Sequence, residues 1–268
     1  MNLFPDNPNQ KNIIELQGVS QSYDGGNNWI IDKLDFIIED KPDQGQFVVI
    51  LGMSGSGKST ILRYIAGLQE PTLGTVKVRG KKVDESQRIS MVFQQYSSLP
   101  WMTVLENVGL ALKFQGVSKD ERNEKAMELI RLVGLEGHEY KYAQYPTLSG
   151  GQLQRVAIAR SLLASPKILL MDEPFGALDI KTRLSMQDLL TNIWHQFQST
   201  IVFVTHDISE AVYLADDIYI MKSQPSKFVE HIHIDLPLER DRSIKRNPQY
   251  VSLVHKVEDR MVAVSEMK

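Results

Sequence analysis

The chain has 268 residues, of which 42% are hydrophobic, so it is long enough to fold as a globular protein with one large domain or a core plus a subdomain. Its 30 Lys and Arg residues nearly balance 33 Asp and Glu residues, which removes the bulk electrostatic argument for a nucleic-acid partner, and we expect none. The sequence contains no cysteine, which excludes disulfides, thiolate zinc sites and cysteine nucleophiles.

The amino-terminal sequence is polar and interrupted by proline, unlike a secretory signal peptide. No apolar run approaches the roughly 18 residues that a membrane-spanning helix needs. We therefore expect a soluble chain, and docking on a membrane protein remains open.

Two short strands are predicted first, over 13–23 and 29–39, because apolar and polar residues partly alternate there. The turn-forming sequence DGGNN separates them, which predicts a small antiparallel β layer. The apolar run at 47–51 is typical of a strand buried on both faces, and a glycine-rich loop and an apolar-periodic helix at 61–68 follow it.

The loop GMSGSGKS after this strand has the spacing of a phosphate-binding loop. Gly52 and Gly57 allow backbone N–H groups to wrap around phosphates. Lys58 brings a positive charge to the β and γ groups, and Ser59 offers its hydroxyl to magnesium. An ordinary glycine-rich turn is the alternative, which the buried strand in front of the loop disfavours.

An inserted helical subdomain is predicted between Val104 and Tyr145, where the pattern turns helical. Residues 118–121 have the pattern of a capping box, and Gly134 ends the helix that follows. The predicted apolar face of this helix consists of Ala126, Leu129, Ile130 and Val133.

A second phosphate-binding helix start is predicted at the sequence LSGGQ. Ser149 and Gln152 form a capping-box pattern, and the glycines between them leave N–H groups accessible to a γ-phosphate. One nucleotide has room for both this helix start and the phosphate loop only if the two elements approach it from opposite sides. A second subunit, arranged head to tail, is the simplest source of the second element. The alternative is an ordinary helix start that tolerates glycine.

Two further buried strands are predicted at 167–171 and 200–204, which favours a parallel α/β sheet. Asp172 and Glu173 lie at the carboxyl end of the strand predicted at 167–171, where ligands bind in open parallel sheets. Asp172 is suited to hold magnesium and Glu173 to orient or deprotonate the attacking water, although a solvated turn is the alternative. His206 ends the second strand and reaches the same edge of the sheet, with a structural role as its alternative.

The carboxyl-terminal part is less informative. His231 and His233 alternate along a strand, and an exposed strand edge is favoured over a metal site because no third ligand is visible. A final helix is predicted with Asn247 as its cap and Pro248 at its first position. Its apolar stripe at 251, 254 and 261 is interpreted as core packing rather than as a partner surface.

Together these motifs resemble the ATPase subunit of ATP-binding cassette (ABC) transporters, from about Ile13 to Met221. GMSGSGKST resembles the family's Walker A motif, LSGGQ its signature, ILLMDE its Walker B motif and GALD its D-loop. Gln94 matches the Q-loop glutamine and His206 the switch histidine. Tyr23 matches the aromatic residue that stacks on adenine, with the nearby Trp29 as the alternative.

The resemblance implies ATP and Mg²⁺ as cofactors. For catalysis it implies Glu173, His206 and Gln94, for magnesium Ser59, Gln94 and Asp172, and for the D-loop at the dimer interface Asp179. For ATP binding it implies Tyr23, Gly52, Ser54, Gly55, Gly57, Lys58, Ser59, Thr60, Ser149, Gly150, Gly151 and Gln152. The expected fold is an α/β P-loop NTPase with a mainly parallel core sheet, a small antiparallel β layer and the inserted helical subdomain.

The sequences FQQYSSLPWMTVLENV and RDRSIKRNPQY resemble those of the bacterial importers of nitrate, sulfonates and taurine. This implies an ATPase that powers import of such a solute, as a homodimer or heterodimer, with membrane permease subunits and a separate solute-binding protein. The implied location is the cytoplasmic face of the inner membrane, with Leu99 and Trp101 contacting the permease. A soluble ABC ATPase and an exporter or lipid-transport ATPase are the alternatives.

The predicted domain organisation follows from the same comparison. An ABC ATPase domain spans 1–240 and includes the helical subdomain at about 97–150. A carboxyl-terminal helical extension spans 241–268.

Overall fold

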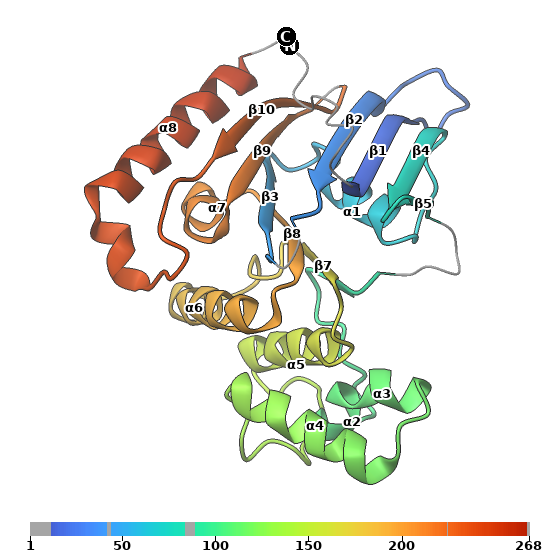
Figure 1. The fold of residues 1–268 in the computed structure, drawn as a ribbon, viewed down its shortest axis with the longest axis vertical. Coiled ribbons are helices and arrows are strands. Elements are labelled where there is room, and N and C mark those ends of the chain that lie inside the picture. The colour runs from blue at the N-terminus through green and yellow to red at the C-terminus, as the bar shows by residue number, and fades with distance from the viewer. Residues whose placement is uncertain (1–11, 42–43, 84–88, 224, 267–268) are drawn as a thin grey trace. The chain divides into compact units, whose positions relative to one another are not determined.

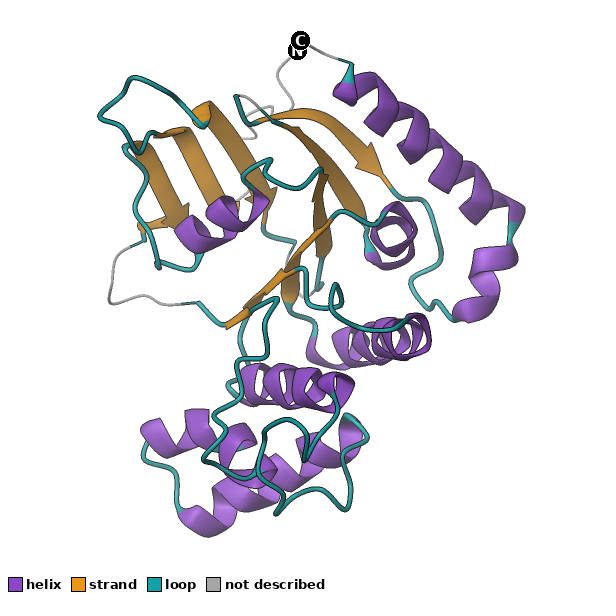
Figure 2. Ribbon diagram, turned by 180° about the vertical axis from the view of Figure 1, so that it is seen from behind, coloured by secondary structure: helices purple, strands orange, loops and turns teal. Residues whose placement is uncertain are grey.

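The structure is a computed structural model that describes residues 12–41, 44–83, 89–223 and 225–266. The chain divides into two compact units, of which unit 1 comprises Met1–Ile89 and Thr200–Lys268 and unit 2 comprises Ser90–Ser199. Figure 1 labels the helices and strands of both, and Figure 2 shows them from behind. Among the described residues, no helix combines the length and the hydropathy needed to cross a bilayer.

The antiparallel β layer of unit 1 has the strand order β2-β1-β4-β5. The strand β1 pairs antiparallel with β2 and with β4, as the alternating sequence predicted. The strands are β1 (Asn12–Gln21), β2 (Ile31–Glu39), β4 (Leu73–Val78) and β5 (Lys81–Lys82).

The second sheet of unit 1 contains, in order, β10, β9, β3 and β8. Here β3 pairs parallel with both β8 and β9, whereas β10 pairs antiparallel with β9. Every residue of β3 and β8 is buried, which confirms that their continuous apolar runs are strands covered on both faces. The strands are β3 (Phe47–Gly52), β8 (Thr200–Thr205), β9 (Asp217–Lys222) and β10 (Lys227–His233).

The last helix, α8 (Pro248–Ser265), begins as predicted, because the Asn247 side chain accepts a hydrogen bond from Gln249 N. It packs on α7 (Ile208–Leu214) and on β9 and β10. Its buried residues, Tyr250, Val257 and Val264, recur every seven positions. The predicted stripe at 251, 254 and 261 is therefore wrong in phase: Val251 is 39% exposed, and the other two residues are only half-buried.

The buried Arg240 anchors the segment before α8 to the rest of unit 1. It precedes the 3₁₀ helix η1 (Arg242–Arg246). Its guanidinium donates to the carbonyl oxygens of Ala215 at 2.8 Å and Pro237 at 2.7 Å. The same guanidinium lies 3.5 Å from the carboxylate of Asp216, whose pKa is raised by burial. Residues 240–266 thus pack as part of unit 1.

Unit 2 contains β6 (Met91–Val92), which pairs parallel with β7 (Ile168–Asp172), and a group of helices. Figure 1 shows α2, α3, α4 and α5 gathered at one end of this unit. The helices are α2 (Val104–Val108), α3 (Leu110–Phe114), α4 (Lys119–Leu132), α5 (Gly150–Leu163) and α6 (Ile180–Phe197).

The helix α4 follows its sequence pattern closely. Ser118 caps it by accepting from Glu121 N, and Gly134 follows its end with a left-handed φ of +67°. The four residues of its predicted apolar face are all buried. Residues 133–149 are not helical, however, so the helical pattern ends earlier than the predicted limit at Tyr145. The predicted domain boundaries at 97–150 and 241–268 stay predictions.

Candidate functional site

The phosphate loop connects β3 to α1 (Lys58–Ile65) in unit 1. A Cβ atom on Gly52 would lie 2.6 Å from the carbonyl oxygen of Met221 and 2.8 Å from Ser56 Oγ, so only glycine fits there. Gly57 caps α1 with a φ of +86°, a conformation that glycine adopts without strain. Buried strand, glycine turn and helix therefore follow one another as a phosphate-binding loop requires. Ser54 and Gly55 are exposed within the loop, and Ser59 and Thr60 are half-buried in the first turn of α1.

Lys58 is held inside this loop. Its side chain is buried, with 4% of its surface exposed, and its ammonium group donates to the carbonyl oxygens of Gly52 at 2.8 Å and Met53 at 2.9 Å. Both acceptors belong to the loop itself, so the charge is positioned by the backbone that would surround a phosphate.

Two other predicted residues belong to unit 1. Tyr23 lies in the turn after β1, is 66% exposed and accepts a hydrogen bond from Gln69 Nε2 at 3.1 Å. Trp29, its alternative, is half-buried, so Tyr23 presents the more accessible ring. His206 follows β8 and is exposed; because Thr205 pairs with Leu51, His206 lies at the same edge of the sheet as the start of the phosphate loop.

In unit 2, the two adjacent carboxylates lie at the carboxyl end of β7, as predicted. Asp172 is the last residue of the strand and is buried. Glu173 is half-buried and has a φ of +42°, a region that residues other than glycine rarely adopt. Such strained conformations concentrate at functional sites, and a plain solvated turn does not require one.

Gln94 is brought close to Glu173 by the pairing of β6 and β7. The register aligns Met91 with Leu170, so the loops after both strands lie at the same edge. A Cβ atom on Gly176 would lie 3.6 Å from Gln94 Nε2 and 3.8 Å from Glu173 Oε2. The amide of Gln94 and the carboxylate of Glu173 thus flank the same small turn.

The start of α5 has the complete capping box that its sequence predicts. Ser149 Oγ accepts from Gln152 N at 3.3 Å, and Gln152 Oε1 accepts from Ser149 N at 2.8 Å. A Cβ atom on Gly150 would overlap the Tyr96 hydroxyl, and one on Gly151 would overlap Thr182 Cγ2. The two glycines therefore allow Tyr96 and Thr182 to pack closely on the start of the helix.

Asp179 caps α6. Its carboxylate accepts from Thr182 N at 3.1 Å, and hydrogen bonding to Thr182 lowers the pKa of Asp179. The carboxylate is therefore ionised at neutral pH, and it stabilises the positive end of the helix dipole.

Trp101 is 70% exposed, so its side chain does not fill a core. Leu99 is half-buried. The fully buried Asn107 holds the turn between them. Its Oδ1 accepts from Leu99 N at 2.8 Å, and its Nδ2 donates to Leu99 O at 3.0 Å and to Met102 O at 3.2 Å. Sequence reasoning missed Asn107, although the capping-box pattern formed by Thr103 and Glu106 indicates that a helix starts there.

The predicted site residues thus fall in two groups. Unit 1 carries Tyr23, the phosphate loop with Lys58 and Ser59, and His206; unit 2 carries Gln94, Leu99, Trp101, the LSGGQ helix start, Asp172, Glu173 and Asp179. Within each unit the structure brings together residues that are far apart in the sequence. The roles predicted for the individual residues stay predictions.

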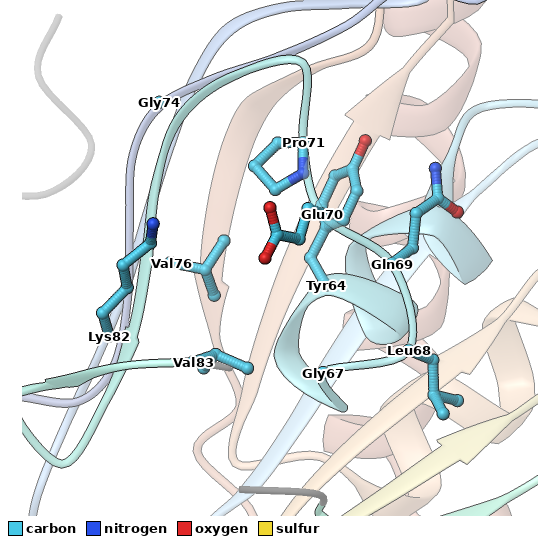
Figure 3. A pocket seen from close by; sticks show the side chains of 10 residues that line it. All are labelled: Tyr64, Gly67, Leu68, Gln69, Glu70, Pro71, Gly74, Val76, Lys82 and Val83. Atoms are coloured by element: carbon cyan, nitrogen blue, oxygen red, sulfur yellow. The ribbon is translucent and has the colours of Figure 1, made fainter. Parts of the chain in front are cut away.

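Two other features lie apart from these groups. A cavity of about 200 Å³ beyond the carboxyl end of α1, shown in Figure 3, is lined by Tyr64, Glu70 and Lys82 among others and by none of the predicted ATP-binding residues. His231 and His233 both contact Asp217 Oδ1, at 2.8 and 3.0 Å, and no metal-binding group of three or more ligands occurs among the described residues.

Comparison with known proteins agrees with this geometry. Residues 38–176 match the ABC transporter family. The nitrate import ATP-binding protein NrtD of Synechocystis is 47% identical over 215 residues, which cover 78% of this chain and 80% of that protein. The taurine import ATP-binding protein TauB of Pseudomonas fluorescens is 39% identical over 249 residues, with coverages of 89% and 90%.

Among solved structures, the dimeric bacterial ABC transporter cassette MJ0796 is 34% identical, with a TM-score of 0.71 over 84% of this chain and all of that one. A dimeric post-hydrolysis state of the same cassette, bound to ADP and Pi, is 33% identical, with a TM-score of 0.70 and the same coverage. The chain therefore belongs to the ABC transporter family. It has the P-loop NTPase fold of that family's cassettes, and it is an ATP-binding, ATP-hydrolysing subunit.

Proposed function

We propose that this chain is the ATPase subunit that powers import of a small anion or organic solute such as nitrate, a sulfonate or taurine. The observation that carries the proposal is the similarity to nitrate and taurine import ATP-binding proteins, which spans 78% and 89% of this chain. The similarity therefore extends beyond the ATP-binding motifs that all ABC proteins share.

In the proposed mechanism, Tyr23 stacks on adenine, and the phosphate loop with Lys58 binds the phosphates of ATP. The N–H groups of a glycine-rich loop and the charge of a buried lysine suit this role. Lys58 already lies against the loop carbonyls, so binding exchanges those acceptors for phosphate oxygens.

The residues that would hold Mg²⁺ fit its chemistry, since Ser59, Gln94 and Asp172 offer hydroxyl, amide and carboxylate oxygens. When bound, the ion neutralises charge on the β- and γ-phosphates. Glu173 accepts the proton of the attacking water as the bond between the γ-phosphorus and the bridging oxygen breaks. Gln94 orients the same water, because it flanks the turn after Glu173, and His206 donates to the γ-phosphate.

The second phosphate-binding helix start belongs to the partner's nucleotide in this proposal. Two copies facing head to tail form two composite sites, each built from one phosphate loop and one LSGGQ helix. Asp179 lies in the D-loop at the same interface. The dimeric state of MJ0796 supports a dimer, and a heterodimer with a related subunit would use the same proposed contacts.

A permease is proposed to dock on the exposed aromatic surface of unit 2. The segment 102–105 pairs with 139–143 through the bonds from Val104 N to Lys141 O and from Ala143 N to Met102 O. This pairing places side by side the segments that carry the exposed rings of Trp101, Tyr140, Tyr142 and Tyr145, and we propose that these rings form one patch. Exposed apolar patches of this kind mark partner surfaces, so a soluble ABC ATPase is disfavoured. The complete importer would include a solute-binding protein, with this chain peripheral on the cytoplasmic face of the inner membrane.

Uptake of labelled solute tests the proposal. The chain is expressed in bacterial strains that each lack one import ATPase, for nitrate, for a sulfonate or for taurine. We expect ATP-dependent uptake to return in one of these strains, and not with the Lys58→Ala variant. Absence of uptake in every strain, with the chain bound to the membrane and hydrolysing ATP, would contradict the importer assignment.

A further inference from the structure

The segment 94–97 of unit 2 touches two parts of the candidate site that serve different nucleotides in the proposed dimer. At its start, Gln94 flanks the turn between Glu173 and Gly176, which acts on the nucleotide bound by the same chain. At Tyr96, the side chain reaches the first turn of α5, which acts on the nucleotide bound by the partner. Only one residue, Gln95, therefore separates the two side chains that contact the two sites.

The contact between Tyr96 and α5 is close. The position of a Cβ atom on Gly150 overlaps the Tyr96 hydroxyl and lies 2.9 Å from Cζ of the ring. Glycine at this position lets the phenol lie directly on the helix backbone. Tyr96 is 38% exposed, so burial in a core does not explain why its ring lies there.

The segment is attached to α5 a second time. The guanidinium of Arg160, in the last turn of the helix, donates to Ser97 O at 2.7 Å and to Ser97 Oγ at 2.8 Å. Bidentate guanidinium contacts fix orientation as well as position. The segment that begins at Gln94 is thus attached to the first turn of α5 through Tyr96 and to its last turn through Ser97.

We propose that Tyr96 is a positioning residue that couples the two composite nucleotide sites. When Gln94 moves on binding of ATP and water in its own site, Tyr96 transmits the displacement to Gly150 and so sets the LSGGQ helix start against the partner's γ-phosphate. The inference rests on the proposed composite dimer, and it assigns to Tyr96 a role that the sequence motifs do not.

The test is a double-mutant cycle on the full chain. Gly150→Ala places a methyl group where the phenol lies and displaces it, so this variant and Tyr96→Ala remove the same contact. If the two effects were independent, the fold-decreases in kcat would multiply. We expect the kcat of the double variant to be at least about threefold higher than that product predicts. The matched control is Gly151→Ala, whose new methyl group meets Thr182 instead, and its effect should multiply with that of Tyr96→Ala.

The second readout is the dependence of the rate on ATP concentration. We expect a sigmoidal dependence in the parent and a hyperbolic one in Tyr96→Ala, with ATP affinity of the isolated monomer unchanged. A merely structural role would lower the melting temperature and leave the sigmoidal shape. If Gly150→Ala does not fold, the curve for Tyr96→Ala decides alone.

The outcomes separate the two proposals. Independent effects of Gly150→Ala and Tyr96→Ala, or a sigmoidal curve in Tyr96→Ala, would overturn the role of Tyr96 and leave the composite dimer standing. A hyperbolic curve in the parent would contradict the composite dimer itself, and the role of Tyr96 with it.

Discussion

At the scale of single residues, the site depends on positions where ordinary conformational preferences are broken. Glu173 keeps a left-handed backbone conformation that costs about 1 kcal/mol or more, and it orients the side chain at the end of β7. Gly52 is required by the approach of Met221 O, and Lys58 is buried with its charge held by carbonyl oxygens. None of this geometry is readable from the sequence, which shows only that these residue types occur at the right spacing.

Lys58→Ala tests the residue that holds the phosphates. Hydrogen bonds to charged groups contribute about 1.5–3 kcal/mol, so the Kd for ATP should rise roughly 10- to 100-fold. Titration with a fluorescent ATP analogue measures this change. Arg63→Ala is the matched control, because it removes one positive charge from the exposed side of the same helix, α1. Equal Kd values for both variants and the parent would contradict the assignment of Lys58.

At the scale of elements, the pattern of apolar residues and the capping residues predicted several strands and helices, because they are local signals. The strands β3 and β8 and the capped start of α5 follow from their sequences. The turn around Leu99 could not be predicted, because it depends on Asn107, whose side chain bonds to a backbone eight residues away. The phase of α8 was wrong for a similar reason, since the surfaces of α7 and β10 select which side of the helix is covered.

Trp101→Ala tests the proposed permease surface. Because the side chain is exposed, we expect the free energy of unfolding to change by less than about 0.5 kcal/mol. Binding to the permease should weaken by about 2 kcal/mol or more, as on removal of an anchoring tryptophan. Thermal unfolding of the isolated chain and co-purification with the permease measure the two effects.

Val262→Ala is the control for this prediction, since it truncates an exposed apolar residue on α8 in unit 1. It should leave permease binding unchanged. A large fall in the melting temperature of Trp101→Ala, with normal binding by the folded fraction, would show that the tryptophan serves stability instead.

At the scale of the whole molecule, the chain divides its candidate site between two units, and each carries residues from distant parts of the sequence. The family and the ATPase activity could be predicted from motif order alone, because phosphate binding imposes fixed spacing on glycine, lysine and serine. The contact between Tyr96 and Gly150 could not, because no spacing rule links a tyrosine to a glycine 54 residues later. Two candidate phosphate-binding elements in one chain support the proposal that a second copy completes each site.

Glu173→Gln tests this central claim most directly. The substitution removes the group that accepts the proton of water and leaves the phosphate contacts intact, so bound ATP should hold two copies together through mass action. Light scattering coupled to size-exclusion chromatography measures the mass at millimolar MgATP. We expect a dimer with ATP, a monomer without it, and a monomer under both conditions when Lys58→Ala is added. A Glu173→Gln chain that binds ATP and still elutes as a monomer would contradict the composite site.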